Sequence, residues 1–260
     1  MSQLIGKCIV QGDIKTLTGL RVGGTSGGLK IGGVDLNVIA DPWGKPYIPG
    51  SSLKGKTRSL MERFYQKQPN HNGMHLCQND SDYAGCEVCK IWGIMGDARN
   101  FNKHTLTRLL VKDVYLDETS ISSDMRKNLE LQWTEVKMET SINRLTGTAQ
   151  HGSLRQIERV PAGAVFKDAQ FILNVFEKED KALLKNLFIA LELVENDYLG
   201  GMGSRGYGRV SFQSMTVFWN SRESYINGEV SLDPARKIND GLDTPALLVK
   251  NFDEVLQRMN

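Results

Sequence analysis

The spacing of apolar residues divides the chain into strands and helices. Residues 165–176 alternate between apolar and polar side chains, which predicts a strand with one buried face. Residues 178–195 carry apolar side chains at helical spacing, which predicts a helix with one buried stripe. The positions of that stripe are Leu184, Leu187, Phe188, Leu191 and Val194. The other predicted elements are a strand at 4–12, a helix at 51–65, a strand at 107–116, a strand from 207 to 212 or 219, and a helix at 245–259.

Three irregular stretches interrupt this order: a glycine-rich stretch at 19–33, a polar segment at 69–103 and a polar, basic segment at about 134–164. Without them the order is strand, helix, strand, strand, helix, strand, which is that of the ferredoxin-like fold of RNA-recognition domains. We therefore predict an α+β protein with a ferredoxin-like (RRM-like) core. Its expected parts are a core of residues 1–68 and 104–220, an insertion at 69–103, an exposed hairpin at about 134–164, and a C-terminal tail at 221–260 with a loop and a helix.

Composition narrows the class of protein only a little. The 260 residues are 40% hydrophobic and 24% charged, as in ordinary globular proteins. No stretch approaches the roughly 20 apolar residues of a membrane span, and the N-terminus lacks the apolar run of a signal peptide. We therefore expect a cytoplasmic protein without a membrane partner. A net charge of +2 does not by itself indicate nucleic-acid binding, so such a site must come from local clusters of Lys and Arg.

Cysteine and histidine spacing predicts a metal site in the segment 69–103. Cys8 lies in an apolar run and is expected in the core. The pattern His-x-Cys-x8-Cys-x2-Cys provides four ligands for tetrahedral zinc, and four protein ligands leave no open position, so the zinc would be structural. The predicted ligands are His75, Cys77, Cys86 and Cys89. His71 is an alternative fourth ligand, and free thiols in a loop are the alternative to zinc.

Two motif matches fail on their context. Residues 50–57 fit the phosphate-binding pattern Gly-x4-Gly-Lys-Thr, but Pro46 and Pro49 just before them exclude the central parallel strand that this motif requires. Residues 201–206 fit the dinucleotide pattern Gly-x-Gly-x-x-Gly, but they follow a predicted helix and precede a strand, the reverse of the required order. Both segments still combine small residues with cations, which suits RNA phosphates. A helix cap or a plain turn is the alternative for each.

Five motifs in one order carry a family resemblance. They are IGGVD at 31–35, IPGSSLKGKTR at 48–58, TSINRLTGTA at 140–149, RQIERVP at 155–161 and GGMGSRGYGRV at 200–210. Together they resemble the RAMP-superfamily backbone subunit of type III-A CRISPR effector complexes, the third Csm subunit. The resemblance runs from near residue 5 to about residue 220. Residues 151–153 depart from the resemblance, since the family pattern would give a shorter hairpin tip at this position.

The resemblance implies a fold shaped like a hand and a role in RNA cleavage. The core would be a palm, the zinc-binding insertion 69–103 a lid, and the hairpin at about 134–164 a thumb. Copies of the subunit would stack along a guide RNA beside other Csm subunits, and complementary target RNA would be cut at regular intervals with a divalent cation, Mg or Mn. The implied catalytic residue is Asp35. The implied RNA-binding residues are Ser51, Ser52, Lys54, Lys56, Arg58, Gly201, Gly203, Ser204, Arg205, Gly206, Tyr207, Arg209, Arg144 and Arg155.

Two hypotheses follow for the activity. In the first the chain is a guide-bound endoribonuclease in which Asp35 binds a metal or accepts the proton of the RNA 2′-hydroxyl. In the second it is a non-catalytic scaffold, which the scarcity of histidines and paired carboxylates favours. From composition alone Asp35 would be a turn residue, and only the resemblance gives it a catalytic role. A nucleotide-binding enzyme is the third class, and the failed motif contexts argue against it.

Overall fold

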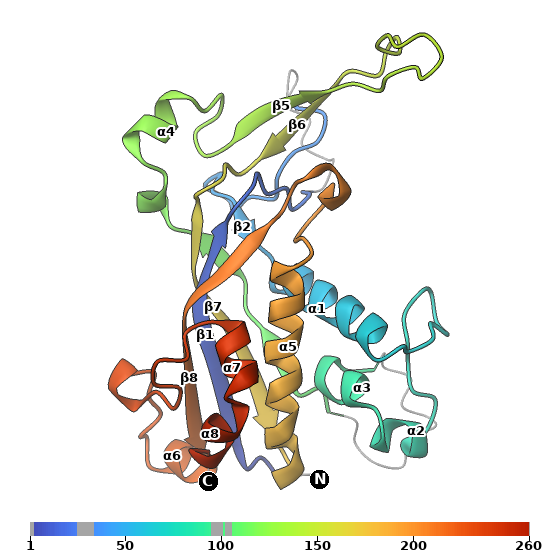
Figure 1. Cartoon of the computed structure of the whole chain (residues 1–260). Helices are drawn as coiled ribbons and strands as arrows, with labels where there is room; N and C mark the ends of the chain where they lie inside the picture. The colour runs from blue at the N-terminus through green and yellow to red at the C-terminus, as the bar shows by residue number, and fades with distance from the viewer. Residues whose placement is uncertain (1–2, 25–33, 95–100, 102–105, 260) are drawn as a thin grey trace.

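An antiparallel sheet forms the centre of the protein in the computed structural model, which describes residues 3–24, 34–94, 101 and 106–259. The strand order is β2-β4-β7-β1-β8, with β3 also paired to β7 (Figure 1). The bounds are β1 Gly6–Thr16, β2 Tyr47–Ile48, β3 Leu109–Val111, β4 Val114–Leu116, β7 Val165–Val175 and β8 Val210–Ser221. The sequence prediction of an α+β protein is therefore confirmed.

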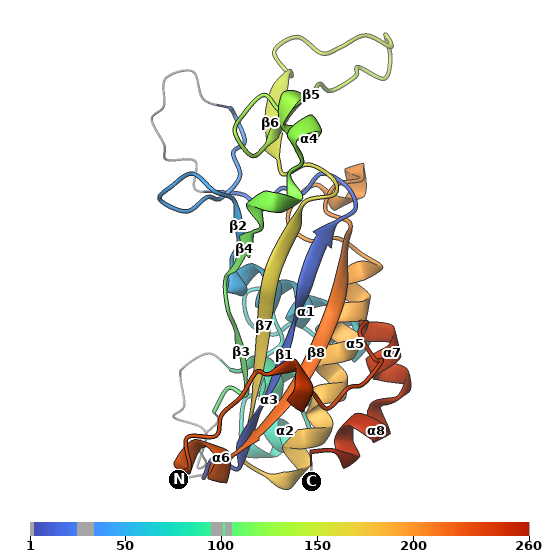
Figure 2. The same ribbon diagram turned by 90° about the vertical axis from the view of Figure 1, so that its left-hand side faces the viewer.

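Helices cover one face of this sheet. The bounds are α1 Gly50–Phe64, α2 Asp80–Ala84, α3 Glu87–Trp92 and α5 Leu184–Glu195. Figures 1 and 2 show α1 and α5 against the same face. The buried side chains of Cys8, Val10 and Ile14 on β1 belong to the same hydrophobic core as those of α1 and α5. The five predicted stripe positions of α5 are all fully buried. On α1, Leu53 and Met61 are buried, and Phe64 is half exposed.

The predicted strand 107–116 is broken into two short strands, and a residue at the break bonds to the start of α1. Lys112 and Asp113 separate β3 from β4, and the Asp113 carboxylate accepts a hydrogen bond of 2.7 Å from the backbone N–H of Gly50. This carboxylate satisfies one of the free N–H groups at the start of α1. Neither Ser51 nor Ser52 caps α1 through its side chain.

A second, two-stranded sheet projects from one end of the molecule. It is a hairpin of β5 Glu135–Glu139 and β6 Arg155–Arg159, paired in a regular antiparallel register (Figures 1 and 2). The hairpin lies within the segment 134–164, where the sequence predicted one. Residues 142–152 at its tip are exposed, and a short helix α4 Ser123–Lys127 lies near its base.

The C-terminal segment belongs to the same core. The predicted helix at 245–259 is present as two helices, α7 Pro245–Lys250 and α8 Phe252–Gln257, which meet at Asn251. The predicted loop at 220–240 contains α6 Arg222–Ile226 and a turn of 3₁₀ helix, η5 Pro234–Arg236. Asn239 is buried and bonds through its side chain to the backbone of Val217 and Met215, which covers part of the outer edge of β8.

A buried ion pair fastens the helical segment 80–92 to the sheet. Arg108 donates a 2.6 Å hydrogen bond to Asp180 and another to the hydroxyl of Tyr83 on α2. Asp180 lies in η3 Lys178–Leu183, a 3₁₀ turn that replaces the first part of the predicted helix 178–195. Within the described ranges, no helix is long and apolar enough to span a membrane.

Replacing Leu248 on α7 by Ala should lower the free energy of unfolding by about 2–5 kcal/mol, because its side chain is fully buried. The matched control is Leu247→Ala: that side chain is 38% exposed, so its loss should change stability by less than about 0.5 kcal/mol. Urea unfolding followed by circular dichroism measures both. Equal effects of the two substitutions would show that α7 is not part of the core.

Candidate metal cluster and RNA interface

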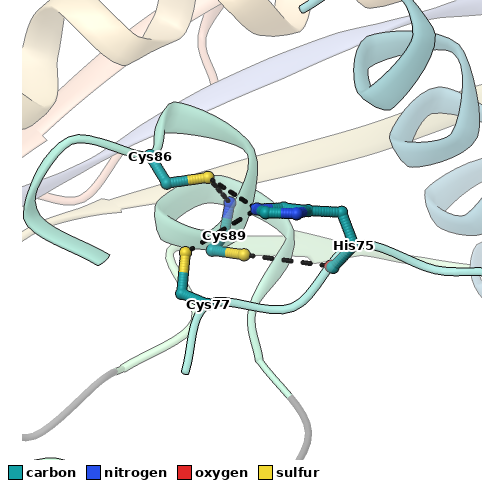
Figure 3. A group of neighbouring side chains, drawn as sticks. All are labelled: His75, Cys77, Cys86 and Cys89. Carbon is teal, nitrogen blue, oxygen red and sulfur yellow. Dashed lines mark hydrogen bonds between the residues drawn. The ribbon is translucent and has the colours of Figure 1, made fainter. Parts of the chain in front are cut away.

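The four predicted metal ligands meet in one cluster. The ligand atoms of His75, Cys77, Cys86 and Cys89 all lie within 4.8 Å of one another (Figure 3). His75 directs Nε2 at two sulfur atoms, with 3.5 Å to Cys86 Sγ and 3.8 Å to Cys77 Sγ. The three cysteines are buried, and their donor set is the one that structural zinc prefers. The group could therefore hold a metal ion.

Local structure explains how two of these ligands come together. Cys86 is the N-cap of α3, and its sulfur accepts a 3.5 Å hydrogen bond from the backbone N–H of Cys89 one turn later. Hydrogen bonding, first of all from the Cys89 thiol, lowers the pKa of the Cys86 thiol well below its usual range. The thiolate is the form that binds metal. His71 is exposed and its ring contacts Asn72, so the structure favours His75 over His71 as the fourth ligand.

The basic side chains of α1 are used inside the protein. Lys54 donates to the carbonyl of Leu109, and Lys56 pairs with Asp197 at 2.9 Å and covers the ring of Tyr198. Arg58 bonds to Glu62 and to two backbone carbonyls beside the cysteine cluster. The expectation that these three cations contact RNA is therefore not supported by their surroundings. Ser51 is exposed and Ser52 partly so, and both lie at the start of the helix.

The glycine loop, residues 199–209, is folded against the chain that follows β1. Gly201 donates to the carbonyl of Arg21 at 2.8 Å, and Gly208 donates to that of Gly19 at 3.0 Å. A Cβ at Gly200 would lie 2.2 Å from the Arg21 oxygen, so only glycine fits there. The loop follows α5 and leads into β8, as the sequence predicted. Its outer positions are exposed: Ser204, Arg205, Gly206 and Arg209, with Gly201 and Gly203 partly buried.

Tyr207 holds the glycine loop to the hairpin. It is 1% exposed, and its hydroxyl donates a 2.7 Å hydrogen bond to Glu139 on β5. Lys137 and Arg159 cover its ring at 4.8 and 5.0 Å from the centroid. Burial and the bond to Glu139 raise the pKa of Tyr207 to about 12. Its ring is thus closed to a nucleobase, and the prediction that Tyr207 contacts RNA stays a prediction for its backbone alone.

An open groove lies between the glycine loop, the base of the hairpin and α4. Its volume is about 560 Å³. Lys137, Arg159 and Arg205 supply three cations to its lining, opposed by Glu135. A groove with several cations beside a loop of exposed backbone has the chemistry of a binding site for a nucleic-acid backbone.

Asp35 lies on the free edge of the hairpin. Its carboxylate accepts a 2.9 Å hydrogen bond from the backbone N–H of Gln156, and the next residue, Leu36, pairs with Ile157 in β6. Glu158 supports the same segment, because its carboxylate accepts from Val38 N–H at 2.8 Å and from the Thr134 hydroxyl at 2.7 Å. Asp35 is exposed. The start of its motif, residues 31–33, lies outside the described residues.

The two predicted arginines of the hairpin differ in position. Arg144 is exposed in the turn at the tip, and Arg155 begins β6 opposite Glu139. The Nε of Arg155 is buried without a hydrogen-bond partner among the described residues, and so is that of Arg21, which the sequence analysis missed. Arg21 lies directly beneath Gly201. The sequence feature that could have identified Arg21 as a candidate was its position inside the glycine-rich stretch.

Comparison with known proteins assigns the chain to a family. A sequence profile of the RAMP superfamily matches residues 13–211, which span most of the sheet and the whole hairpin. A relative from Methanocaldococcus jannaschii, named "CRISPR system Cms endoribonuclease Csm3", is 38% identical over 99% of this chain and 97% of its own length. Relatives of the same name from Enterococcus italicus and Streptococcus thermophilus are 37% and 35% identical, over 80% and 82% of this chain and 91% and 92% of their own lengths.

A solved structure supports the same assignment. It is a crystal structure of a Csm3-Csm4 subcomplex in the type III-A CRISPR-Cas interference complex, with a TM-score of 0.57, 27% identity and a match over 97% of both chains. The chain therefore belongs to the RAMP superfamily and, within it, to the Csm3 family.

Replacing Tyr207 by Phe should lower the free energy of unfolding by about 1–2 kcal/mol near neutral pH, because a buried bond to a carboxylate is lost. The bond from Tyr207 lowers the pKa of Glu139, so its stabilisation is present above the ordinary pKa of Glu and is lost as the pH falls through the lowered value. The difference between the two proteins should therefore shrink as the pH falls below the ordinary pKa of Glu. Urea unfolding at neutral pH and at a series of lower pH values measures it, with Tyr225→Phe as the control, because Tyr225 is 39% exposed. A difference that does not change with pH would contradict this role of Glu139.

Proposed function

We propose that this chain is a guide-RNA-binding backbone subunit of a type III-A CRISPR interference complex, and that it cleaves complementary target RNA at regular intervals. The observation that carries the proposal is the position of Asp35, an exposed carboxylate bonded to the edge of a projecting hairpin. The names of the relatives, which describe endoribonucleases, support it. A non-catalytic scaffold in the same kind of complex is the alternative.

The parts of the fold fit the proposed hand. The order β8-β1-β7-β4, with α1 and α5 on one face, is what a ferredoxin-like palm at 1–68 and 104–220 requires. The β5–β6 hairpin would be the thumb, at about 134–164, and residues 69–103 the lid, of which 95–100 and 102–103 lie outside the described residues. The tail 221–260 would be an extension of the palm, since α7 packs on α5.

The guide RNA would cross the face formed by the glycine loop and the start of α1. Exposed Ser51, Ser204 and Arg209 offer hydrogen-bond donors there, and Arg205 and Arg21 offer cations. The groove beside Tyr207 continues this path to the base of the hairpin. Exposed Arg144 at the hairpin tip and Arg155 would serve the RNA on the hairpin itself.

Cleavage would use the 2′-hydroxyl of the target RNA as the nucleophile. A hairpin that separates neighbouring nucleotides can bring this hydroxyl into line with the phosphorus and the leaving oxygen. Asp35 lies on the free edge of the hairpin beside Gln156, near the start of β6. There its carboxylate can accept the hydroxyl proton or hold a divalent cation, and carboxylate oxygens are the ligands that Mg and Mn prefer. Such a cation would stabilise the charge on the phosphate in the transition state.

Zinc would be the structural metal of the lid. His75, Cys77, Cys86 and Cys89 fit it by donor type, and with four protein ligands it would leave no position for substrate. The further partners would be target RNA, other Csm subunits and additional copies of this chain in a helical stack, in the cytoplasm. The crystal structure of a Csm3-Csm4 subcomplex supports the contact with other Csm subunits.

Asp35→Asn should strongly slow cutting without weakening target binding. The Asn side-chain oxygen can still accept from Gln156 N–H, so the segment stays in place while the charge is lost. Cleavage of labelled target RNA by the purified complex with Mg should slow by about 100-fold or more. Asp253→Asn, at an exposed position of α8, is the control and should cut at the wild-type rate. Undiminished cutting by Asp35→Asn would leave the scaffold as the correct function.

Cys89→Ser should remove the zinc. Purified wild-type chain should contain about one equivalent by elemental mass spectrometry, and the variant should contain almost none and unfold at a lower temperature. The matched control is Cys8→Ala, because Cys8 is buried in β1 outside the cluster, and this variant should keep its zinc. Full zinc content in Cys89→Ser would rule out the proposed ligand set.

A further inference from the structure

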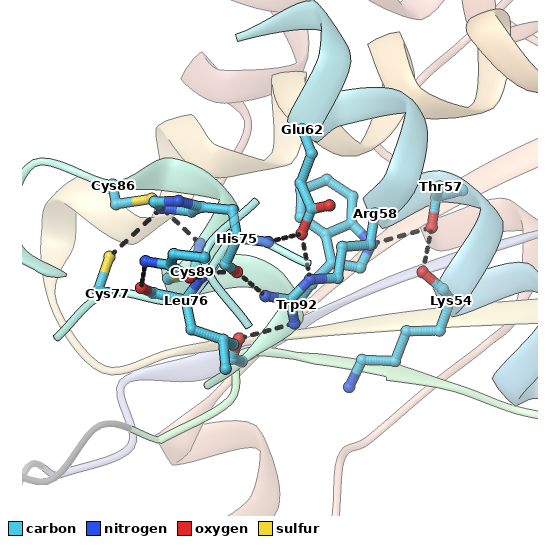
Figure 4. Close-up of polar contacts among 12 residues, drawn as sticks. Lys54, Thr57, Arg58, Glu62, His75, Leu76, Cys77, Cys86, Cys89 and Trp92 are labelled. Atoms are coloured by element: carbon cyan, nitrogen blue, oxygen red, sulfur yellow. Dashed lines mark hydrogen bonds and ion pairs between the residues drawn. The ribbon is translucent and has the colours of Figure 1, made fainter. Parts of the chain in front are cut away.

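One arginine of α1 joins the two halves of the cysteine cluster. Arg58 Nη2 donates to the backbone carbonyl of His75 at 2.7 Å, and Nη1 donates to that of Gly93 at 2.9 Å (Figure 4). Gly93 directly follows α3, the helix whose first turn carries Cys86 and Cys89. The planar fork of a guanidinium can bind two such acceptors at fixed spacing, which a lysine cannot do.

Glu62 completes the arrangement. It lies one turn after Arg58, accepts 2.8 Å from Arg58 Nε, and accepts 3.3 Å from the backbone N–H of His75. The peptide groups on both sides of His75 are therefore held by one ion pair on α1. The His75 ring is oriented separately, because Nδ1 contacts the carbonyl of Gln68 at 3.2 Å and Nε2 is left for the sulfur atoms.

This pair is largely removed from water. The side chain of Arg58 is 13% exposed and that of Glu62 is 11% exposed. Three of the five N–H donors of the guanidinium are bonded to Glu62 and to the two backbone carbonyls, so little of the group is left open to a phosphate. Arg63 on the same helix is exposed, so α1 offers a comparison between a buried cation and an open one.

We propose that Arg58 is a positioning residue of the metal cluster and makes no contact with RNA. With Glu62 it fixes the distance between the His75 segment and the end of α3, and so sets the geometry of the four ligands. It also joins the cluster to α1, the helix whose first turn carries Ser51 at the proposed RNA surface. The inference rests on the proposed zinc, but not on guide binding or cleavage.

The rate of zinc release tests this role. Zinc-loaded full-length chain is mixed with excess of a coloured chelator, and the absorbance is followed for wild type, Arg58→Lys, Arg58→Gln and the control Arg63→Gln. Both Arg58 variants should release zinc at least about tenfold faster, since residues that orient metal ligands typically account for 10- to 100-fold in affinity. Arg63→Gln should match wild type. Wild-type release by Arg58→Lys would overturn the proposal, because a role of charge alone would survive in lysine.

Two further measurements separate positioning from other roles. The visible spectrum of the Co(II)-loaded chain reports ligand geometry and should change in both Arg58 variants but not in Arg63→Gln; an unchanged spectrum means a general loss of stability and contradicts the proposal. The salt dependence of guide-RNA binding by zinc-loaded Arg58→Gln should equal that of wild type. A slope reduced by about 0.7, the value for one lost contact to single-stranded RNA phosphate, would make Arg58 an RNA contact after all.

Discussion

The short segment that follows β1 is the constraint on which the proposed RNA surface depends. Residues 17–22 receive backbone hydrogen bonds from the glycine loop on one side and from Val160 and Ile39 on the other. The loop, the hairpin and the Asp35 segment are thereby attached to one piece of chain, and that piece is a direct extension of the central strand. Because β1 is paired along its length to both β7 and β8, the position of its end is fixed. The glycine loop, the hairpin and the Asp35 segment are positioned by their bonds to the residues that follow it.

Periodicity was enough to predict the elements that have one clear buried face. The alternation at 165–176 and the apolar stripe at 178–195 correspond to β7 and α5 with few changes of boundary. Periodicity failed where the structure depends on the hydrogen bonds of a single polar side chain. Asp113 interrupts a strand and accepts a hydrogen bond from the first residue of α1, and Asn239, in a predicted loop, bonds to the edge of β8. Such bonds join residues far apart in sequence.

For the candidate site, spacing located the groups but not their partners. The four metal ligands were predictable, because a tetrahedral ion requires close pairs of donors and the sequence supplies them. Lys56, Arg58 and Tyr207 lie in motifs that suit RNA, yet the side chain of each is bonded to another part of the fold. Arg21 was missed for the opposite reason, because it lies outside the five motifs. The glycine loop folds onto it, and its Nε has no partner among the described residues.

Because the Asp35 segment pairs with β6, the length of the hairpin tip does not determine where the Asp35 carboxylate lies. The hairpin can gain residues at its tip, as at 151–153, without moving the carboxylate, because Asp35 is bonded at Gln156, near the start of β6 and outside the tip. Under the proposed function, the reach of the hairpin and the place of the cut would therefore be set independently. The tip could then vary to suit neighbouring subunits, while the interval between successive cuts would stay fixed by the spacing of the stacked copies.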